Sequence, residues 1–147
     1  MFMQRLDYHA ASPAAMQAMM GVEIAVERLG LEASLLYLVK LRCSQINGCA
    51  FCVDLHSGDA LACGEASARL DAVAGWREAD CFSARERAAL AWTESLALLP
   101  ASRAPDGDYV ALAAEFSPCE QGALTLAISD AMAWTHFGVG FRTVPAH

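Results

Sequence analysis

Apolar residues recur at helical spacing along almost the whole chain. Between positions 31 and 46 they include Leu35, Leu38, Val39 and Leu41, a spacing typical of the buried face of a helix. No alternation of apolar and polar residues continues over five positions, so the pattern predicts no strand. The chain is therefore predicted to be all-α, with about six or seven helices.

Residues that begin and end helices divide this pattern. Ser12 and Pro13 are typical of a helix start, and Gly30 is typical of a helix end. Asn47 and Gly48 then interrupt the apolar run, and we expect Asn47 to cap the next helix. The predicted helices of this half span residues 13–30, 31–46, 49–62 and 65–73.

Two capping boxes mark the second half of the chain. In each, a serine is followed three residues later by a glutamate, as in Ser83 with Glu86 and Ser117 with Glu120. The predicted helices of this half span residues 83–99, 105–116 and 117–141, and the stretch 100–108 is predicted as a loop.

The apolar content is higher than one small core requires. The chain has 147 residues, of which 56% are hydrophobic, against about 45–50% in an average soluble domain. A chain of this length is expected to form one domain, here residues 1–147. A small domain leaves much of its surface exposed, so we expect part of the apolar surface to lie in the interface of a homo-oligomer.

The charge and the termini exclude several classes of partner. A formal net charge of −7 without any basic run argues against nucleic acid. The start of the chain lacks the pattern of an export signal, and no apolar run reaches the roughly 18 residues that cross a membrane. The most apolar stretch, 122–141, contains Asp130 and His136 and is predicted as an interior helix. We therefore expect a cytoplasmic protein whose six cysteines are mostly reduced.

The candidate chemistry lies in the stretch SQINGCAFCVDLHSGDALACG, residues 44–64. Cys49 and Cys52 are three residues apart and His56 follows four residues later, so all three share one face of the predicted helix. Free N–H groups at a helix start stabilise a thiolate, whereas burial among apolar side chains opposes it. In a reducing compartment, such a pair is more typical of catalysis or metal binding than of a structural disulfide.

The residues leave three interpretations of this pair. A structural zinc site needs four ligands, and Cys43 or Cys63 would have to join Cys49, Cys52 and His56, although neither belongs to a second CxxC. A second interpretation is that the two cysteines are simply buried core thiols, but this would leave the regular spacing from Cys52 to His56 as a coincidence. A redox pair is the interpretation that the residues favour, although a thioredoxin-like βαβ context is absent from the pattern.

The segment KLRCSQINGCAFCVDLHSGDALACGE closely resembles the signature of the AhpD-like alkylhydroperoxidases, within the carboxymuconolactone decarboxylase superfamily. The similarity extends to SARERAALAWTESLALL and LTLAISDAMAWTHFGVGFRTVP, and it covers about residues 13–145. It implies an all-helical subunit that assembles into trimers or hexamers. It also implies reduction of a hydroperoxide by a dithiol that becomes a disulfide and is restored by an external thiol or disulfide reductase, without a cofactor or metal.

The resemblance also implies roles for single residues. Carried over by position, the redox couple is Cys49 and Cys52, and His56 is the proton-relay histidine. The spacing places His56 next to Cys52, so we expect Cys52 to attack the peroxide and Cys49 to resolve the resulting sulfenic acid. Proximity to the helix start alone would instead make Cys49 the more acidic thiol.

The chain departs from the family pattern in two places. Relatives carry a glutamate twelve residues before the first motif cysteine, where this chain has Tyr37. A phenol is a poor base at neutral pH, so Tyr37 is a candidate for a weaker proton relay or a pocket residue. Many relatives carry Asn-x-x-Asn-Arg in the last helix, where this chain has Met132, Thr135 and His136. His136 is a second candidate pocket residue, with a hydrogen-bonded core position as the alternative.

The remaining candidates have simpler interpretations. Asp130 is expected to satisfy a buried partner or to face solvent, and the near-terminal His9 and His147 carry no expectation. Small apolar packing on helices is expected for the other four cysteines, Cys43, Cys63, Cys81 and Cys119. Two other functions stay open: a lactone decarboxylase, which needs acid–base groups and no thiol pair, and a non-catalytic oligomer that keeps the pair as a redox sensor or metal site.

Overall fold

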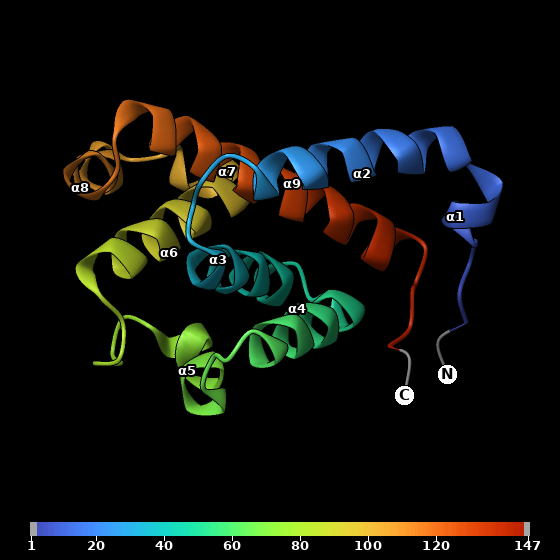
Figure 1. Ribbon diagram of the computed structural model, residues 1–147, viewed down its shortest axis with the longest axis horizontal. Coiled ribbons are helices and arrows are strands. Elements are labelled where there is room, and N and C mark those ends of the chain that lie inside the picture. Colours follow the sequence, from blue (N-terminus) through green and yellow to red (C-terminus); the bar gives the residue numbers. More distant parts are fainter. Residues whose placement is uncertain (1–2, 146–147) are drawn as a thin grey trace.

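The computed structural model describes residues 3–145, and these fold into nine α-helices and one 3₁₀-helix, with no strand among them (Figure 1). The all-α prediction is therefore confirmed. The predicted number of six or seven helices is too low for the described residues. The helices are α1 (Tyr8–Ala11), α2 (Pro13–Glu27), α3 (Ala33–Ile46), α4 (Ala50–Ala62), α5 (Ser67–Ala72), the 3₁₀-helix (Val73–Gly75), α6 (Ala84–Ala97), α7 (Leu99–Ser102), α8 (Asp106–Glu115) and α9 (Pro118–Gly140).

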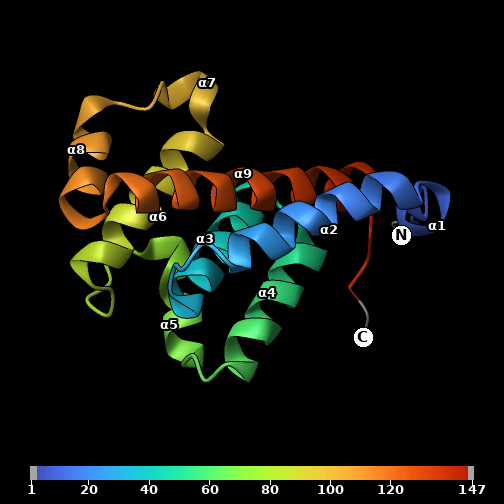
Figure 2. The same ribbon diagram turned by 45° about the horizontal axis from the view of Figure 1, so that its top comes forward.

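Helix α3 lies at the centre and packs against α4, α6 and α9. The long helices α2 and α9 run side by side along one face of the molecule (Figures 1 and 2). The two ends of the described chain meet at one end of the molecule, where the Arg5 N–H donates to the Phe141 carbonyl at 2.8 Å. The Tyr8 ring packs there against Phe137 and Phe141, with centroid distances of 5.2 and 5.7 Å.

Two apolar clusters make the core, and α3 contributes to both. Leu38 faces a cluster formed with α4, α5, the 3₁₀-helix and α6. Val39, the next residue, faces a larger cluster formed with α2, α6, α8 and α9. Both side chains are fully buried, which explains why the central helix is apolar on more than one face.

Both predicted capping boxes are present. The Ser83 hydroxyl accepts from the Glu86 N–H, and the Glu86 carboxylate accepts from the Ser83 N–H at the start of α6. Ser117 and Glu120 make the same reciprocal pair at the start of α9. These starts were predictable because the bonds join residues three positions apart and need no other element.

The prediction for Asn47 is wrong. Asn47 closes α3 rather than capping α4, and its side-chain amide donates to the Thr135 hydroxyl of α9 at 2.7 Å. Gly48 then takes a φ of +63°, a left-handed conformation that glycine adopts without strain, and turns the chain. As a result Cys49 itself is the N-cap of α4, which begins at Ala50.

Other boundaries differ because short helices were missed. Residue Ser12 precedes α2 as expected, but its side chain makes no capping hydrogen bond. The helix predicted to reach Leu99 ends at Ala97, and the supposed loop after it begins with α7, where Pro100 lies in the first turn. The helix predicted over 65–73 is split into α5 and the 3₁₀-helix. His147 lies outside the described residues.

Within residues 3–145, none of the helices combines the length and the apolar character that crossing a membrane requires.

Candidate functional site

Cys49 and Cys52 form a disulfide at the start of α4, with their Cα atoms 5.2 Å apart. Cys49 is the N-cap, and its sulfur accepts from the Cys52 N–H at 3.3 Å. A capping sulfur is where the free N–H groups of a helix favour a negative charge, so the fold supports a thiolate at Cys49 once the pair is reduced.

The two sulfurs are covered by the last helix of the chain. Cys49 and Cys52 are 2% and 3% exposed. A methyl group built onto Gly138 of α9 would lie 2.6 Å from the Cys49 sulfur and 3.1 Å from the Cys52 sulfur. No Cβ fits at 2.6 Å, so glycine is required where α9 crosses the pair.

We expect Gly138→Ala to destabilise the oxidised protein by about 1–3 kcal/mol, because the added methyl group overpacks the disulfide. Urea denaturation of the oxidised protein measures this change. Gly140→Ala is the matched control, because Gly140 belongs to the same helix and no neighbouring atom lies within 4 Å of a Cβ added there. Equal midpoints for the two variants would contradict the close approach of Gly138.

One hollow of about 270 Å³ reaches Cys52 and His56 together, and we call it the Cys52 hollow. His56 lies one turn after Cys52 on α4, as the spacing predicts. Most of the wall is apolar. The lining residues are Tyr8, His9, Met20, Glu23, Phe51, Cys52, Leu55, His56 and Trp134.

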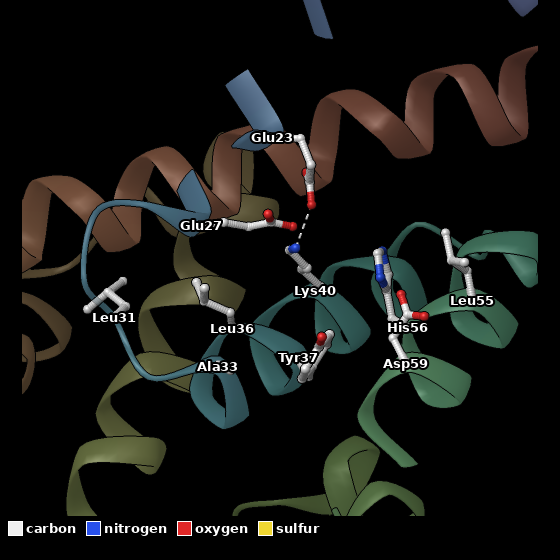
Figure 3. Close-up of a pocket in the computed structure, with 10 residues that line it drawn as sticks. All are labelled: Glu23, Glu27, Leu31, Ala33, Leu36, Tyr37, Lys40, Leu55, His56 and Asp59. Carbon is white, nitrogen blue, oxygen red and sulfur yellow. Dashed lines mark hydrogen bonds and ion pairs between the residues drawn. The ribbon is translucent and has the colours of Figure 1, made fainter. Parts of the chain in front are cut away.

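A second hollow of about 370 Å³ adjoins the first along Glu23, Leu55 and His56, and we call it the Lys40 cavity (Figure 3). The Lys40 ammonium is 2.6 Å from the Glu23 carboxylate, and Lys40 is only 6% exposed. Figure 3 shows Glu23 and Lys40 pointing toward each other, with His56 on the neighbouring helix α4 facing the same cavity. An ion pair between a buried lysine and a half-buried glutamate therefore lies beside the histidine.

The environment keeps His56 neutral. Burial, with a further contribution from the Lys40 ammonium, lowers the pKa of His56 to about 4, while Glu23 and Asp59 act in the opposite direction. The imidazole is therefore unprotonated at neutral pH. A neutral imidazole can accept a proton from a thiol that lies beside it.

A third ionisable side chain extends this network. Asp130 of α9 is 3% exposed, and neither of its oxygens accepts a hydrogen bond of ordinary geometry from an N–H or hydroxyl group. Burial and the facing Glu23 carboxyl raise the pKa of Asp130 to about 8. Burial by itself would raise the pKa of Glu23, but hydrogen bonds from Asp130 and Lys40 lower it below its usual value. At neutral pH Asp130 is therefore protonated and Glu23 is negatively charged. Of the two expectations for Asp130, a buried partner or exposure to solvent, the structure shows the buried partner.

Sequence reasoning missed Glu23 and Lys40. Lys40 lies within the apolar run of α3, two residues before Arg42, and a lysine is rarely buried without a partner. That anomaly was the available signal. Its partner could not be identified, because Glu23 lies on another helix, and several acidic residues precede Lys40.

Tyr37 shares the Lys40 cavity with His56 but is held elsewhere. Its hydroxyl is 3.4 Å from the sulfur of Cys63, the residue that ends α4. That hydrogen bond, together with burial, raises the pKa of Tyr37 to about 12. At neutral pH the Tyr37 hydroxyl is therefore even less ionised than that of an unperturbed tyrosine, so it is even less available as a base.

His136 lies away from this site. It is exposed and lines a shallow depression with Asn47, Met132 and Thr135, which belongs to neither hollow described above. The core alternative for His136 is therefore wrong, and its role in a pocket stays a prediction.

The other four cysteines differ in environment. Cys43 is buried in the larger apolar cluster, and burial raises its pKa to about 12. The expectation of packed small side chains holds for Cys43 alone, because the other three, Cys63, Cys81 and Cys119, are exposed. Within residues 3–145, no three side chains of His, Cys, Asp or Glu are grouped closely enough to hold a metal ion.

A family model matches residues 10–95, which include both motif cysteines, His56, Glu23 and Lys40, and its description is the carboxymuconolactone decarboxylase family. The chain belongs to the carboxymuconolactone decarboxylase family. An uncharacterised protein of similar size, YdfG of Bacillus subtilis (strain 168), is 33% identical to this chain over 136 residues, which make up 92% of each chain.

Solved structures resemble this carboxymuconolactone decarboxylase family member along almost its whole length. A protein of unknown function from Agrobacterium tumefaciens, proposed to be an antioxidant defence protein AhpD, superposes with a TM-score of 0.97, 36% identity and 99% coverage of both chains. The debrominase Bmp8 superposes with a TM-score of 0.80 at 18% identity, over 93% of this chain and 74% of that one. At this low identity, the likeness to Bmp8 concerns the fold alone.

Proposed function

We propose that this protein reduces organic hydroperoxides through the Cys49–Cys52 couple. The observation that carries the proposal is the placement of Cys52 and a neutral His56 in one apolar hollow, with a second cysteine at disulfide distance. The likeness to a protein proposed to be AhpD supports the same chemistry. A hollow of about 270 Å³ walled by Met20, Leu55 and Trp134 favours a substrate with an apolar group over hydrogen peroxide.

In the proposed reaction, His56 accepts the proton of the Cys52 thiol, and the Cys52 thiolate attacks the terminal oxygen of the hydroperoxide, the one that carries the hydrogen. The O–O bond breaks, the alcohol leaves with the proton from His56, and Cys52 becomes a sulfenic acid. The Cys49 thiol then attacks the Cys52 sulfur, which releases water and forms the disulfide. Two equivalents of an external thiol return the pair to the dithiol.

The proposal gives Glu23, rather than Tyr37, the role of supporting the histidine in proton transfer. Glu23 lines both the Cys52 hollow and the Lys40 cavity, as His56 does, and its charge raises the pKa of His56. We infer that Glu23 offsets the Lys40 ammonium and keeps His56 basic enough to accept the thiol proton. Tyr37, bound to Cys63, is left out of the proton path.

We also propose that the protein is a homo-oligomer, as the high apolar content suggests. Large apolar side chains remain exposed on the surface, among them Ile24, Leu29, Leu61 and Leu126. Burying such side chains between subunits is favourable by roughly 25 cal/mol for each Å² removed from water.

The test of the function is a titration of the fully reduced protein with tert-butyl hydroperoxide. One equivalent should consume two thiols and give a peptide-mapped Cys49–Cys52 disulfide. The Cys63→Ser variant is the control for the exposed thiols, and it should behave as the parent does. Survival of both motif thiols in the presence of peroxide would refute the proposed function.

A further inference from the structure

The two cysteines of the disulfide line different systems of hollows. Cys52 lines the Cys52 hollow, which continues into the Lys40 cavity. Cys49 instead lines a hollow of about 280 Å³ between the start of α4 and residues 138–145 at the end of the chain, which we call the Cys49 hollow. No lining residue of the Cys49 hollow belongs to the Cys52 hollow or the Lys40 cavity.

The Cys49 hollow has its own route to the surface. It adjoins a wide, open depression of about 590 Å³, with which it shares Gly48, Ala50 and Pro145. Gly48 and Ala50 are themselves exposed. A slender thiol can therefore approach Cys49 past the start of α4 without entering the space beside His56.

We propose that the external thiol that resets the disulfide binds in the Cys49 hollow and attacks the Cys49 sulfur, while the peroxide reacts in the Cys52 hollow. Cys49 and Cys52 then serve two partners from opposite sides of the same bond. The proposal rests on the proposed function for the origin of the disulfide, but the thiol attack itself needs no peroxide.

The chemistry of each step suits this placement. The attacking thiolate forms a bond to the Cys49 sulfur, the Cys49–Cys52 bond breaks, and Cys52 leaves as the thiolate beside His56, where the next peroxide reacts. A second thiol then attacks the external sulfur of the mixed disulfide, and the external disulfide leaves. Cys49 departs as a thiolate whose charge the Cys52 N–H stabilises.

The experiment compares two filling variants, one on each side. Ala50→Phe fills the Cys49 hollow and the depression outside it, and Leu55→Phe fills the Cys52 hollow; both positions are exposed, so the fold tolerates the larger rings. Ala62→Phe, at the far end of α4 and also exposed, is the control. Reduction of the oxidised proteins by dithiothreitol is followed by alkylation and mass spectrometry, and oxidation of the reduced proteins by tert-butyl hydroperoxide is followed separately.

We expect Ala50→Phe to slow reduction by dithiothreitol at least about tenfold, with Leu55→Phe and Ala62→Phe within about twofold of the parent. We expect the reverse for oxidation, which Leu55→Phe slows and Ala50→Phe does not. Unchanged reduction in Ala50→Phe, or slower reduction in Leu55→Phe, would overturn the proposal. A protein that fails to react with peroxide at all would refute the proposed function and leave the reduction result to decide the side of thiol attack.

Discussion

Replacing Cys52 by serine should abolish reaction with tert-butyl hydroperoxide, lowering the rate of peroxide consumption by about 10³-fold or more. A serine hydroxyl is not ionised at neutral pH, so the hollow that holds His56 loses its nucleophile. The substitution replaces one buried sulfur by a smaller oxygen in a side chain of the same shape, so the helical fold should persist. Single-turnover kinetics with the pre-reduced variant measure the effect.

The companion variant Cys49→Ser separates the two thiols. It keeps Cys52 and His56 in the Cys52 hollow but removes the resolving thiol. We expect one rapid oxidation at Cys52, a sulfenic acid that a dimedone-type reagent traps, and no second turnover. If the sulfenic acid instead formed at Cys49 in Cys52→Ser, the roles of the two cysteines would be exchanged, as the N-cap position of Cys49 alone would suggest.

Replacing Glu23 by glutamine should slow the oxidation of Cys52 by about 10- to 100-fold. The amide can still accept a hydrogen bond from Lys40, but it no longer offsets the ammonium charge. The pKa of His56, already lowered to about 4, should fall further, which makes the imidazole a weaker base. Single-turnover rates measured from pH 5 to pH 8 test this, with circular dichroism as the check on folding.

Glu27→Gln is the matched control for this prediction. Glu27 lies one turn later on α2 and lines the same cavity, but no hydrogen bond or ion pair joins it to Lys40. Its substitution should leave the rate within about twofold. Equal rates for the Glu23 and Glu27 variants would show that the ion pair of Lys40 has no part in the proton transfer. A large loss in Tyr37→Phe would return that role to the tyrosine.

The carboxyl pair of Glu23 and Asp130 explains how a buried lysine is accommodated. Three ionisable side chains, one each from α2, α3 and α9, meet here. At neutral pH Glu23 and Lys40 are charged and Asp130 is protonated and neutral. Two adjacent carboxylates would repel each other, which is one reason why the pKa of Asp130 is raised to about 8. The same arrangement sets the electrostatic surroundings of His56.

Local patterns were enough to predict the helical class and the close pair of cysteines at the start of α4. The starts of α6 and α9 follow from capping boxes whose bonds join residues three apart. The shared face of Cys49, Cys52 and His56 follows from helix geometry, which fixes the relation of residues three and four apart. Where a capping box or the fixed spacing of a helix carried the signal, the amino-acid sequence by itself determined the outcome, whereas the single capping residues Ser12 and Asn47 did not form the expected caps.

The tertiary structure decided the rest. The pairing of Lys40 with Glu23, the cover of Gly138 over the sulfurs and the contact of Asn47 with Thr135 each join different helices. Such contacts depend on how helices cross and pack, and no spacing along the chain encodes them. For the same reason, only the packing of α9 and the final residues against α4 could separate the surroundings of Cys49 from those of Cys52.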